Sequence, residues 1–190
     1  MNARHLQLCA SDGWAGMVKE HIIPWILEDV DLGDDIIEVG PGPGRTTEIF
    51  RDLAASVTAV ELDEDLAAHL SARFAGSNVQ VIQADATAIP CPDDRFSAAL
   101  SLTMLHHVPD AGLQDRIFAE LARVLRPGGL LAGVDSLDSE RFRALHEDDI
   151  CVPIDPATLP ARLTAAGFVN VRVDKSKTRV RFRATKPPPG

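Results

Sequence analysis

The chain has 190 residues, 45% of them hydrophobic, and a formal net charge of −9. This length and composition suit one compact domain with a continuous core and room for a ligand cleft. The acidic balance argues against nucleic acid or an anionic membrane surface as the main partner. No stretch has the apolar length of a membrane span, so we expect none.

The three cysteines, Cys9, Cys91 and Cys151, lie far apart and form no CxxC pair. They therefore support neither a disulfide framework nor a thiolate zinc site. We expect the protein to be cytoplasmic, because the first residues also lack the long apolar core of a secretion signal.

The sequence divides into a helical segment, an α/β core and a frayed tail, at 1–31, 32–186 and 187–190. We expect a single domain with the first segment lying over its cleft. Apolar side chains recur every three or four positions over 13–29. This spacing predicts an amphipathic helix with Ser11 or Asp12 as its cap and a kink at Pro24.

In the core, short β-rich runs alternate with helix-like stretches, which predicts a parallel sheet with crossover helices on both faces. The predicted strands are 35–39, 57–61, 79–83, 96–101 and 130–134. The predicted helices between them are 46–55, 64–74 and 112–125. After a helix around 157–166, residues 168–174 and 178–185 alternate as two strands, so the sheet should finish in an antiparallel hairpin.

The most informative run joins the first predicted strand to the next helix and contains the glycine turn, Gly40-Pro41-Gly42-Pro43-Gly44. Alternating glycines allow backbone conformations closed to side chains and let a ligand approach closely. A phosphate-binding P-loop is excluded, because Gly44 is followed by Arg45 and not by lysine. The GxGxxG spacing of dinucleotide folds is also absent.

Each of three successive predicted strands has a carboxylate at or near its carboxyl end. Glu38 lies two residues before the first glycine, where it would repel a pyrophosphate and attract an ammonium or sulfonium group. Glu61 can accept hydrogen bonds from two ribose hydroxyls, and Asp85 can accept one from an adenine amine. Ligands of open α/β folds bind where the carboxyl ends of the strands meet, so we expect these carboxylates to line one crevice.

Together with Leu105-His106-His107 and Arg126-Pro127-Gly128-Gly129, these motifs resemble those of the class I S-adenosylmethionine-dependent methyltransferases, including ubiquinone/menaquinone methyltransferases. The resemblance covers nearly the whole chain. It implies a Rossmann-like, seven-stranded α/β sheet, S-adenosyl-L-methionine as methyl donor and S-adenosyl-L-homocysteine as product. One departure is Ser97, where many relatives have Asp.

The resemblance also implies which residues surround the cofactor. Glu38 and Ser101 would address its methionine end, Glu61 the ribose, and Leu62, Asp85 and Ala86 the adenine. The whole expected set is Glu38, Gly40, Pro41, Gly42, Gly44, Glu61, Leu62, Asp85, Ala86 and Ser101.

Methyl transfer from a sulfonium mainly requires an acceptor held in line with an activated methyl group. If a base is needed, His106 and His107 are the candidates, because they occupy the position that faces the methyl group in the resembling family. We expect one of the two to be structural. His146 is a further candidate that we expect to be solvated. No acidic side chain is placed to hold magnesium, so we expect no metal.

The expected acceptor pocket is apolar, which suits a small hydrophobic or amphipathic acceptor. Its residues would be Trp14, Met17, Met104, His106 and Phe142. The cleft would be open or completed by a second subunit, so we expect a monomer or a homodimer.

Three alternatives stay open. Arg179, Arg181 and Arg183 should share one face of the last strand. We expect that face to be solvated and to protect a sheet edge, whereas a nucleic-acid methyltransferase would use it for phosphates. The chain could also be a dehydrogenase-like nucleotide-binding protein, or a non-catalytic member of the methyltransferase family.

Overall fold

The computed structural model describes residues 2–189. In this range the strands are β1 (Asp35–Val39), β2 (Ser56–Glu61), β3 (Val79–Gln83), β4 (Phe96–Leu102), β5 (Leu125–Ser136), β6 (Val169–Lys175) and β7 (Arg179–Thr185). The helices are α1 (Ala3–Ala10), α2 (Asp12–Met17), α3 (Ile23–Ile26), α4 (Arg45–Leu53), α5 (Glu64–Arg73), α6 (Ala111–Val124), α7 (Glu140–Leu145) and α8 (Leu159–Ala165). A π-helical turn, η1 (Val18–Ile22), and a 3-10 turn, η2 (Leu105–His107), complete the set. Every strand and helix predicted for the core is present, and β5 is longer than predicted.

All seven strands form one sheet in the order β3-β2-β1-β4-β5-β7-β6. Strands β1 to β5 pair in parallel, and β7 runs antiparallel to both β5 and β6. The predicted Rossmann-like sheet with a C-terminal antiparallel hairpin is therefore confirmed. The expectation that the last strand, with its arginines, protects an edge of the sheet is wrong. This strand, β7, lies between β5 and β6, and β6 forms the edge.

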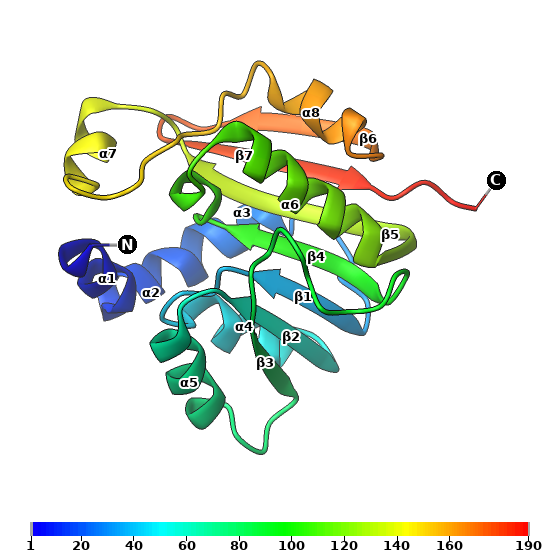
Figure 1. Ribbon diagram of the computed structural model, residues 1–190, viewed down its shortest axis with the longest axis horizontal. Coiled ribbons are helices and arrows are strands. Elements are labelled where there is room, and N and C mark those ends of the chain that lie inside the picture. Colours follow the sequence, from blue (N-terminus) through cyan, green and yellow to red (C-terminus); the bar gives the residue numbers. More distant parts are fainter. Residues whose placement is uncertain (1, 190) are drawn as a thin grey trace.

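Helices cover both faces of the sheet (Figure 1). On one face, α6 and α8 pack against strand side chains such as Ile37, Val39 and Phe182. On the other, η1, α3 and α4 pack against alternate side chains such as Ile36 and Val134. Because neighbouring positions of a strand face opposite sides, the adjacent Ile36 and Ile37 of β1 are buried in different cores, one on each face of the sheet.

The N-terminal segment is a series of short helices. Ser11 caps α2 as predicted, since its hydroxyl accepts a hydrogen bond from the Trp14 N–H at 3.1 Å. The single helix predicted over 13–29 is divided into α2, the π-helical turn η1 and α3, and Pro24 is the second residue of α3. Figure 1 shows α1 and α2 at the end of the sheet toward which the parallel strands point. Within the described range, no helix is long and apolar enough to cross a membrane.

The arginines of β7 share one face, as predicted, but the N-terminal segment covers it. Arg181 is 6% exposed, and it donates to the Trp25 carbonyl at 2.5 Å and to the Glu28 carboxylate at 2.9 Å. Arg183 donates to the Glu28 carbonyl at 2.5 Å. The expectation of a solvated face is wrong, because these guanidinium groups dock helices onto the sheet.

Candidate functional site

The glycine turn joins β1 to α4 and has the conformation that its sequence predicts. Gly40, Gly42 and Gly44 have positive φ values of 65°, 54° and 77°. A Cβ on Gly40 would lie 2.7 Å from the Cβ of Met104, and one on Gly44 would lie 2.4 Å from Leu70. Both the backbone conformation and the available space therefore require glycine at these positions.

Glu61 ends β2 beside the glycine turn and is bonded to it. One carboxylate oxygen accepts a hydrogen bond from the Gly42 N–H at 2.9 Å, and the other accepts one from the Asp63 N–H at 3.0 Å. These bonds orient a carboxylate that belongs to a buried residue. A carboxylate oxygen has two lone pairs, so each can also accept a ligand hydroxyl.

Leu62 and Asp85 supply the exposed part of this crevice. Leu62 is 64% exposed, and its carbonyl accepts a hydrogen bond from the Gln83 side chain at the end of β3. Asp85 is exposed and accepts a hydrogen bond from the Thr87 N–H at 2.8 Å, whereas Ala86 is buried. The ends of β2 and β3 thus present an apolar side chain and a carboxylate next to Glu61.

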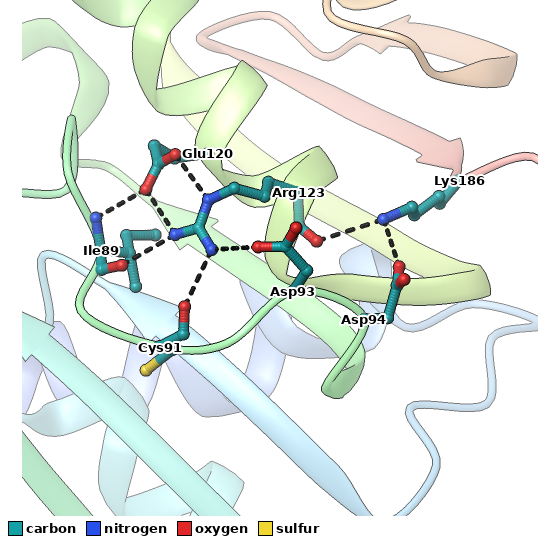
Figure 2. Close-up of polar contacts among 7 residues, drawn as sticks. All are labelled: Ile89, Cys91, Asp93, Asp94, Glu120, Arg123 and Lys186. Atoms are coloured by element: carbon teal, nitrogen blue, oxygen red, sulfur yellow. Dashed lines mark hydrogen bonds and ion pairs between the residues drawn. The ribbon is translucent and has the colours of Figure 1, made fainter.

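The loop after β3 is held in place by α6 (Figure 2). Arg123 donates to the carbonyls of Ile89 and Cys91, each at 2.8 Å. It also pairs with Glu120, whose carboxylate accepts a hydrogen bond from the Ile89 N–H at 2.7 Å. Hydrogen bonding to Arg123 lowers the pKa of Glu120. This network fixes the path of the loop that carries Asp85.

Glu38 lies beneath the glycine turn, and only 1% of it is exposed. Its carboxylate accepts hydrogen bonds from the hydroxyls of Thr46 and Thr47 in α4, the latter at 2.6 Å. Burial raises the pKa of Glu38 to about 7, even though the two threonine bonds act to lower it. Glu38 therefore changes protonation near neutral pH, and a cation bound nearby would favour its ionised form.

The chain makes an unusual turn at the end of β4. Thr103 has a φ of 51°, which is strained for a β-branched residue and costs of the order of 1–3 kcal/mol. This turn places Met104 against Gly40. Ser101, two residues earlier in β4, is 1% exposed, and its hydroxyl has no hydrogen-bond partner among residues 2–189. Backbone strain of this kind concentrates at functional sites.

His106 follows in η2 and pairs with a buried acid. Its Nδ1 lies 2.5 Å from Oδ1 of Asp135, at the end of β5, and both side chains are at most 1% exposed. Because a carboxylate accepts, Nδ1 carries the proton and Nε2 carries the lone pair. An imidazole oriented in this way can act as a general base or as a metal ligand.

Three further histidines surround His106, and together the four form the histidine cluster. His107 comes from η2, His5 from α1 and His146 from the end of α7. The ring centroids of His106 and His107 are 4.3 Å apart, and those of His5 and His146 are 4.4 Å apart. His146 is 3% exposed. The expectation that it is solvated is therefore wrong, because α1 and η2 pack over it.

Most of this cluster is uncharged at neutral pH. Burial, reinforced by the neighbouring imidazoles, lowers the pKa of His5 to about 4 and the pKa of His107 to about 3. Burial also lowers the pKa of His146. Such a weakly basic imidazole takes up protons poorly at neutral pH, which disfavours His107 as a general base.

The residues expected in the acceptor pocket fall into two groups. The ring centroid of Phe142 lies 4.9 Å from that of His106, and Met104, two residues before His106, lies against Gly40. Trp14 and Met17 instead contact Arg179 of β7, and they pack against the second core with η1 and α3. The structure thus brings Phe142 and His106 together, whereas Trp14 and Met17 dock the N-terminal segment onto β7.

Several residues of this site were not predicted from the sequence. Asp135 had a usable signal, since it follows an apolar strand just as Glu61 ends one. Thr46 and Thr47 had a weaker signal, because they open the helix after the glycine turn. His5 had none, since nothing near it in the sequence indicates that α1 packs against residues 106 and 146.

A family model and curated relatives assign the chain to the same family. The sequence matches the model of a family described as a methyltransferase domain over residues 37–133. A probable S-adenosylmethionine-dependent methyltransferase of Mycobacterium tuberculosis is 35% identical over 145 residues, which cover 72% of this chain and 49% of that protein. Ribosomal RNA small subunit methyltransferase A of Synechococcus sp. is 35% identical over 133 residues, which cover 66% and 47%. The chain therefore spans about half the length of these curated relatives.

The fold also has solved counterparts. The crystal structure of a SAM dependent methyltransferase from Aquifex aeolicus superposes with a TM-score of 0.75 at 17% sequence identity, covering 98% of this chain and 99% of that chain. At this level of identity the similarity shows a shared fold.

Proposed function

This chain belongs to the methyltransferase-domain family of class I S-adenosylmethionine-dependent methyltransferases, and from this we propose that it methylates a small, apolar or amphipathic acceptor. S-Adenosyl-L-methionine supplies a methyl group on a sulfonium. The bond from sulfur to methyl breaks as the bond from methyl to acceptor forms. The products are S-adenosyl-L-homocysteine, the methylated acceptor and a proton released from the acceptor.

The observation that carries the proposal is the arrangement at the ends of β1, β2 and β3. Glu61 is oriented by Gly42 to bind the ribose, and the exposed Leu62 and Asp85 lie beside it to contact the adenine. Glu38 would favour the amino group of the methionine end through its charge, since its oxygens already bind two threonine hydroxyls. The residues present therefore fit this cofactor.

Two observations favour a small acceptor over a nucleic acid. The arginine face of β7 is covered by the N-terminal segment, and the net charge of −9 repels phosphates. Met104, just before η2, lies against Gly40, and Phe142 of α7 packs on His106, so both offer apolar surface near the end of β4. Because the Synechococcus relative is named for ribosomal RNA, RNA is the acceptor class to test against.

A two-part experiment tests this proposal. Calorimetry should show one S-adenosyl-L-homocysteine bound per chain and no binding of NAD. Release of S-adenosyl-L-homocysteine from S-adenosyl-L-methionine is then measured with a panel of small phenols, quinols, amines and thiols, and with small-subunit ribosomal RNA. Turnover with RNA alone would overturn the acceptor class. Tight binding without turnover in either arm would favour a non-catalytic member of the family.

A further inference from the structure

The histidine cluster has the composition and geometry of a metal centre. One potential ligand atom from each of His5, His106, His107 and His146 lies within 4.8 Å of the other three. We propose that the histidine cluster binds one divalent first-row transition-metal ion, with zinc as the reference ion. Imidazole nitrogen is a preferred ligand for zinc, copper, nickel and iron. The proposal does not depend on methyl transfer.

Four ring nitrogens of the cluster, one from each histidine, make no hydrogen bond with any described residue. They are Nδ1 of His5, Nε2 of His106, Nδ1 of His107 and Nε2 of His146, all fully buried. Leaving such groups unpaired is costly. A water molecule could donate at most two hydrogen bonds to these atoms, whereas a tetrahedral cation accepts four lone pairs.

Two of the four imidazoles have the outer hydrogen bonds that metal ligands commonly make. Nδ1 of His106 donates to Asp135 at 2.5 Å, and Nδ1 of His146 donates to the Phe142 carbonyl at 2.8 Å. Each bond fixes the tautomer, so that Nε2 presents its lone pair to the centre. A carboxylate or carbonyl behind a histidine is the usual arrangement around protein-bound zinc.

The surrounding charge also suits a divalent cation. Asp135 is fully buried behind His106, and a carboxylate oxygen of Asp149 lies 3.9 Å from Nδ1 of His107. Two carboxylates would balance the two positive charges of the ion, because the imidazole ligands themselves are neutral. Burying a cation without such compensation would be strongly unfavourable.

The scaffold around the cluster is held by bonds that need no metal. The Asn2 side chain, just before α1, donates to the carbonyls of Leu145 and Glu147 at 3.0 and 3.1 Å. The His106 carbonyl accepts from the Val152 N–H at 2.8 Å. Nitrogen ligands of a tetrahedral zinc ion lie roughly 3.3 Å apart, given Zn–N distances of about 2.0–2.1 Å. Small rotations of the side chains would therefore close the site.

Four imidazoles would complete the coordination of the ion, so its role would be to hold α1 and α7 over the end of β4. Nε2 of His106 would then be a ligand and not a general base. Our sequence expectation of no metal considered thiolate ligands for zinc and acidic ligands for magnesium, but not a set of histidines. Histidines spread from residue 5 to residue 146 form no spacing motif, so only the fold brings them together.

The first test uses the untagged chain of 190 residues, stripped with a chelator and dialysed. Zinc is titrated against a chromophoric chelator, and cobalt is added in a parallel sample for its visible spectrum. We expect one zinc per chain, a rise in melting temperature with zinc, and the intense visible bands of tetrahedral cobalt. Weak octahedral cobalt bands, or zinc binding no tighter than that of a control protein with surface histidines, would overturn the proposal.

The second test compares matched substitutions. His146→Gln and His5→Gln each remove one ligand, whereas His21→Gln and His69→Gln remove the two exposed histidines. Asp135→Asn, which keeps His106 but changes its partner, should lower zinc affinity by about 10–100-fold. The two ligand variants should lose more than that, and the two controls nothing. Equal zinc affinity in all five variants would overturn the site. S-Adenosyl-L-homocysteine binding, measured beside it, reports separately on the proposed function.

Discussion

The glycine turn with Glu61 and the histidine cluster with Asp135 lie at the same edge of one sheet, but they are assembled differently. The first is held by contacts such as Gly42 to Glu61, which are 19 positions apart in the chain. The second joins side chains from residue 5 to residue 146 through α1, η2 and α7. The glycine turn with Glu61 therefore follows from the geometry of neighbouring strands and turns. The histidine cluster forms only when segments distant in the sequence pack together.

The largest expected effect is that of Gly40→Ala on the glycine turn. The new Cβ would lie 2.7 Å from Met104 on a backbone with a φ of 65°, so the glycine turn must shift. We expect S-adenosyl-L-homocysteine to bind about 100-fold more weakly or worse, because relieving the clash costs about 1–3 kcal/mol on top of a backbone penalty of about 1–2 kcal/mol. Calorimetry measures the affinity.

Gly76→Ala is the matched control. Gly76 has a φ of 77° but no atom within 4 Å of the added Cβ, so this variant shares the backbone penalty of about 1–2 kcal/mol without the clash. It should bind the ligand normally. Equal affinities for wild type, Gly40→Ala and Gly76→Ala would show that the glycine turn is not the ligand site.

A smaller effect is expected for Glu61→Gln, which keeps the shape of the side chain and removes its charge. Hydrogen bonds to a charged group contribute about 1.5–3 kcal/mol, which corresponds to a loss of roughly 10–150-fold in affinity. Glu64→Gln, an exposed position in the first turn of α5, serves as the control. A similar loss in both variants would point to overall charge and not to a ribose contact.

The third prediction concerns pH and Glu38. Its pKa of about 7 in the free protein should fall when the cationic amino group of the ligand binds, so binding releases protons. Affinity should therefore rise as the pH increases from 6 toward 8, by about tenfold at most. Calorimetry in buffers with different ionisation heats counts the protons, and Glu38→Gln should abolish both the release and the pH dependence.

The same residue gives a linked prediction for stability. A carboxyl group whose pKa is raised in the folded state contributes stability that is fully present below its unfolded pKa and is lost as the pH rises through about 7. The free energy of unfolding of the ligand-free wild type, relative to Glu38→Gln, should therefore decrease between pH 4.5 and pH 7. A difference that stays constant with pH would contradict the raised pKa.

The smallest effect is expected for Leu62→Ala, which removes an exposed apolar surface beside Glu61. Losing part of one buried contact with an adenine costs about 1 kcal/mol, or roughly fivefold in affinity. Leu53→Ala, which is 50% exposed at the end of α4, removes the same atoms from a position with no expected ligand contact. Identical affinities for these two variants would remove Leu62 from the adenine site.

The glycine turn with Glu61 was predictable because its signals are short in range. Glycine spacing indicates positive φ, and a carboxylate at the end of an apolar strand indicates the edge of the sheet, as Glu61 and Asp85 show. The same rule would have found Asp135. The prediction that His146 is solvated was wrong because α1 and η2 bury it. No residue near His146 in the sequence indicates that these segments pack over it.

The arginines of β7 show the same division. Alternation along the strand correctly predicts that Arg179, Arg181 and Arg183 share a face. It cannot predict that β7 inserts between β5 and β6, or that the carbonyls of Trp25 and Glu28 lie over that face. The phosphate-binding role that this face could have had is therefore excluded by packing, not by sequence.

The sequence by itself determined the strands, the helices of the core and the glycine turn, because these depend on local sterics and on periodicities of two and three to four residues. Its motifs also carried the resemblance to the family. Only the tertiary structure decided which groups meet in the histidine cluster. There, the pairing of His106 with Asp135 and the gathering of four imidazoles depend on contacts between segments that the chain itself keeps far apart.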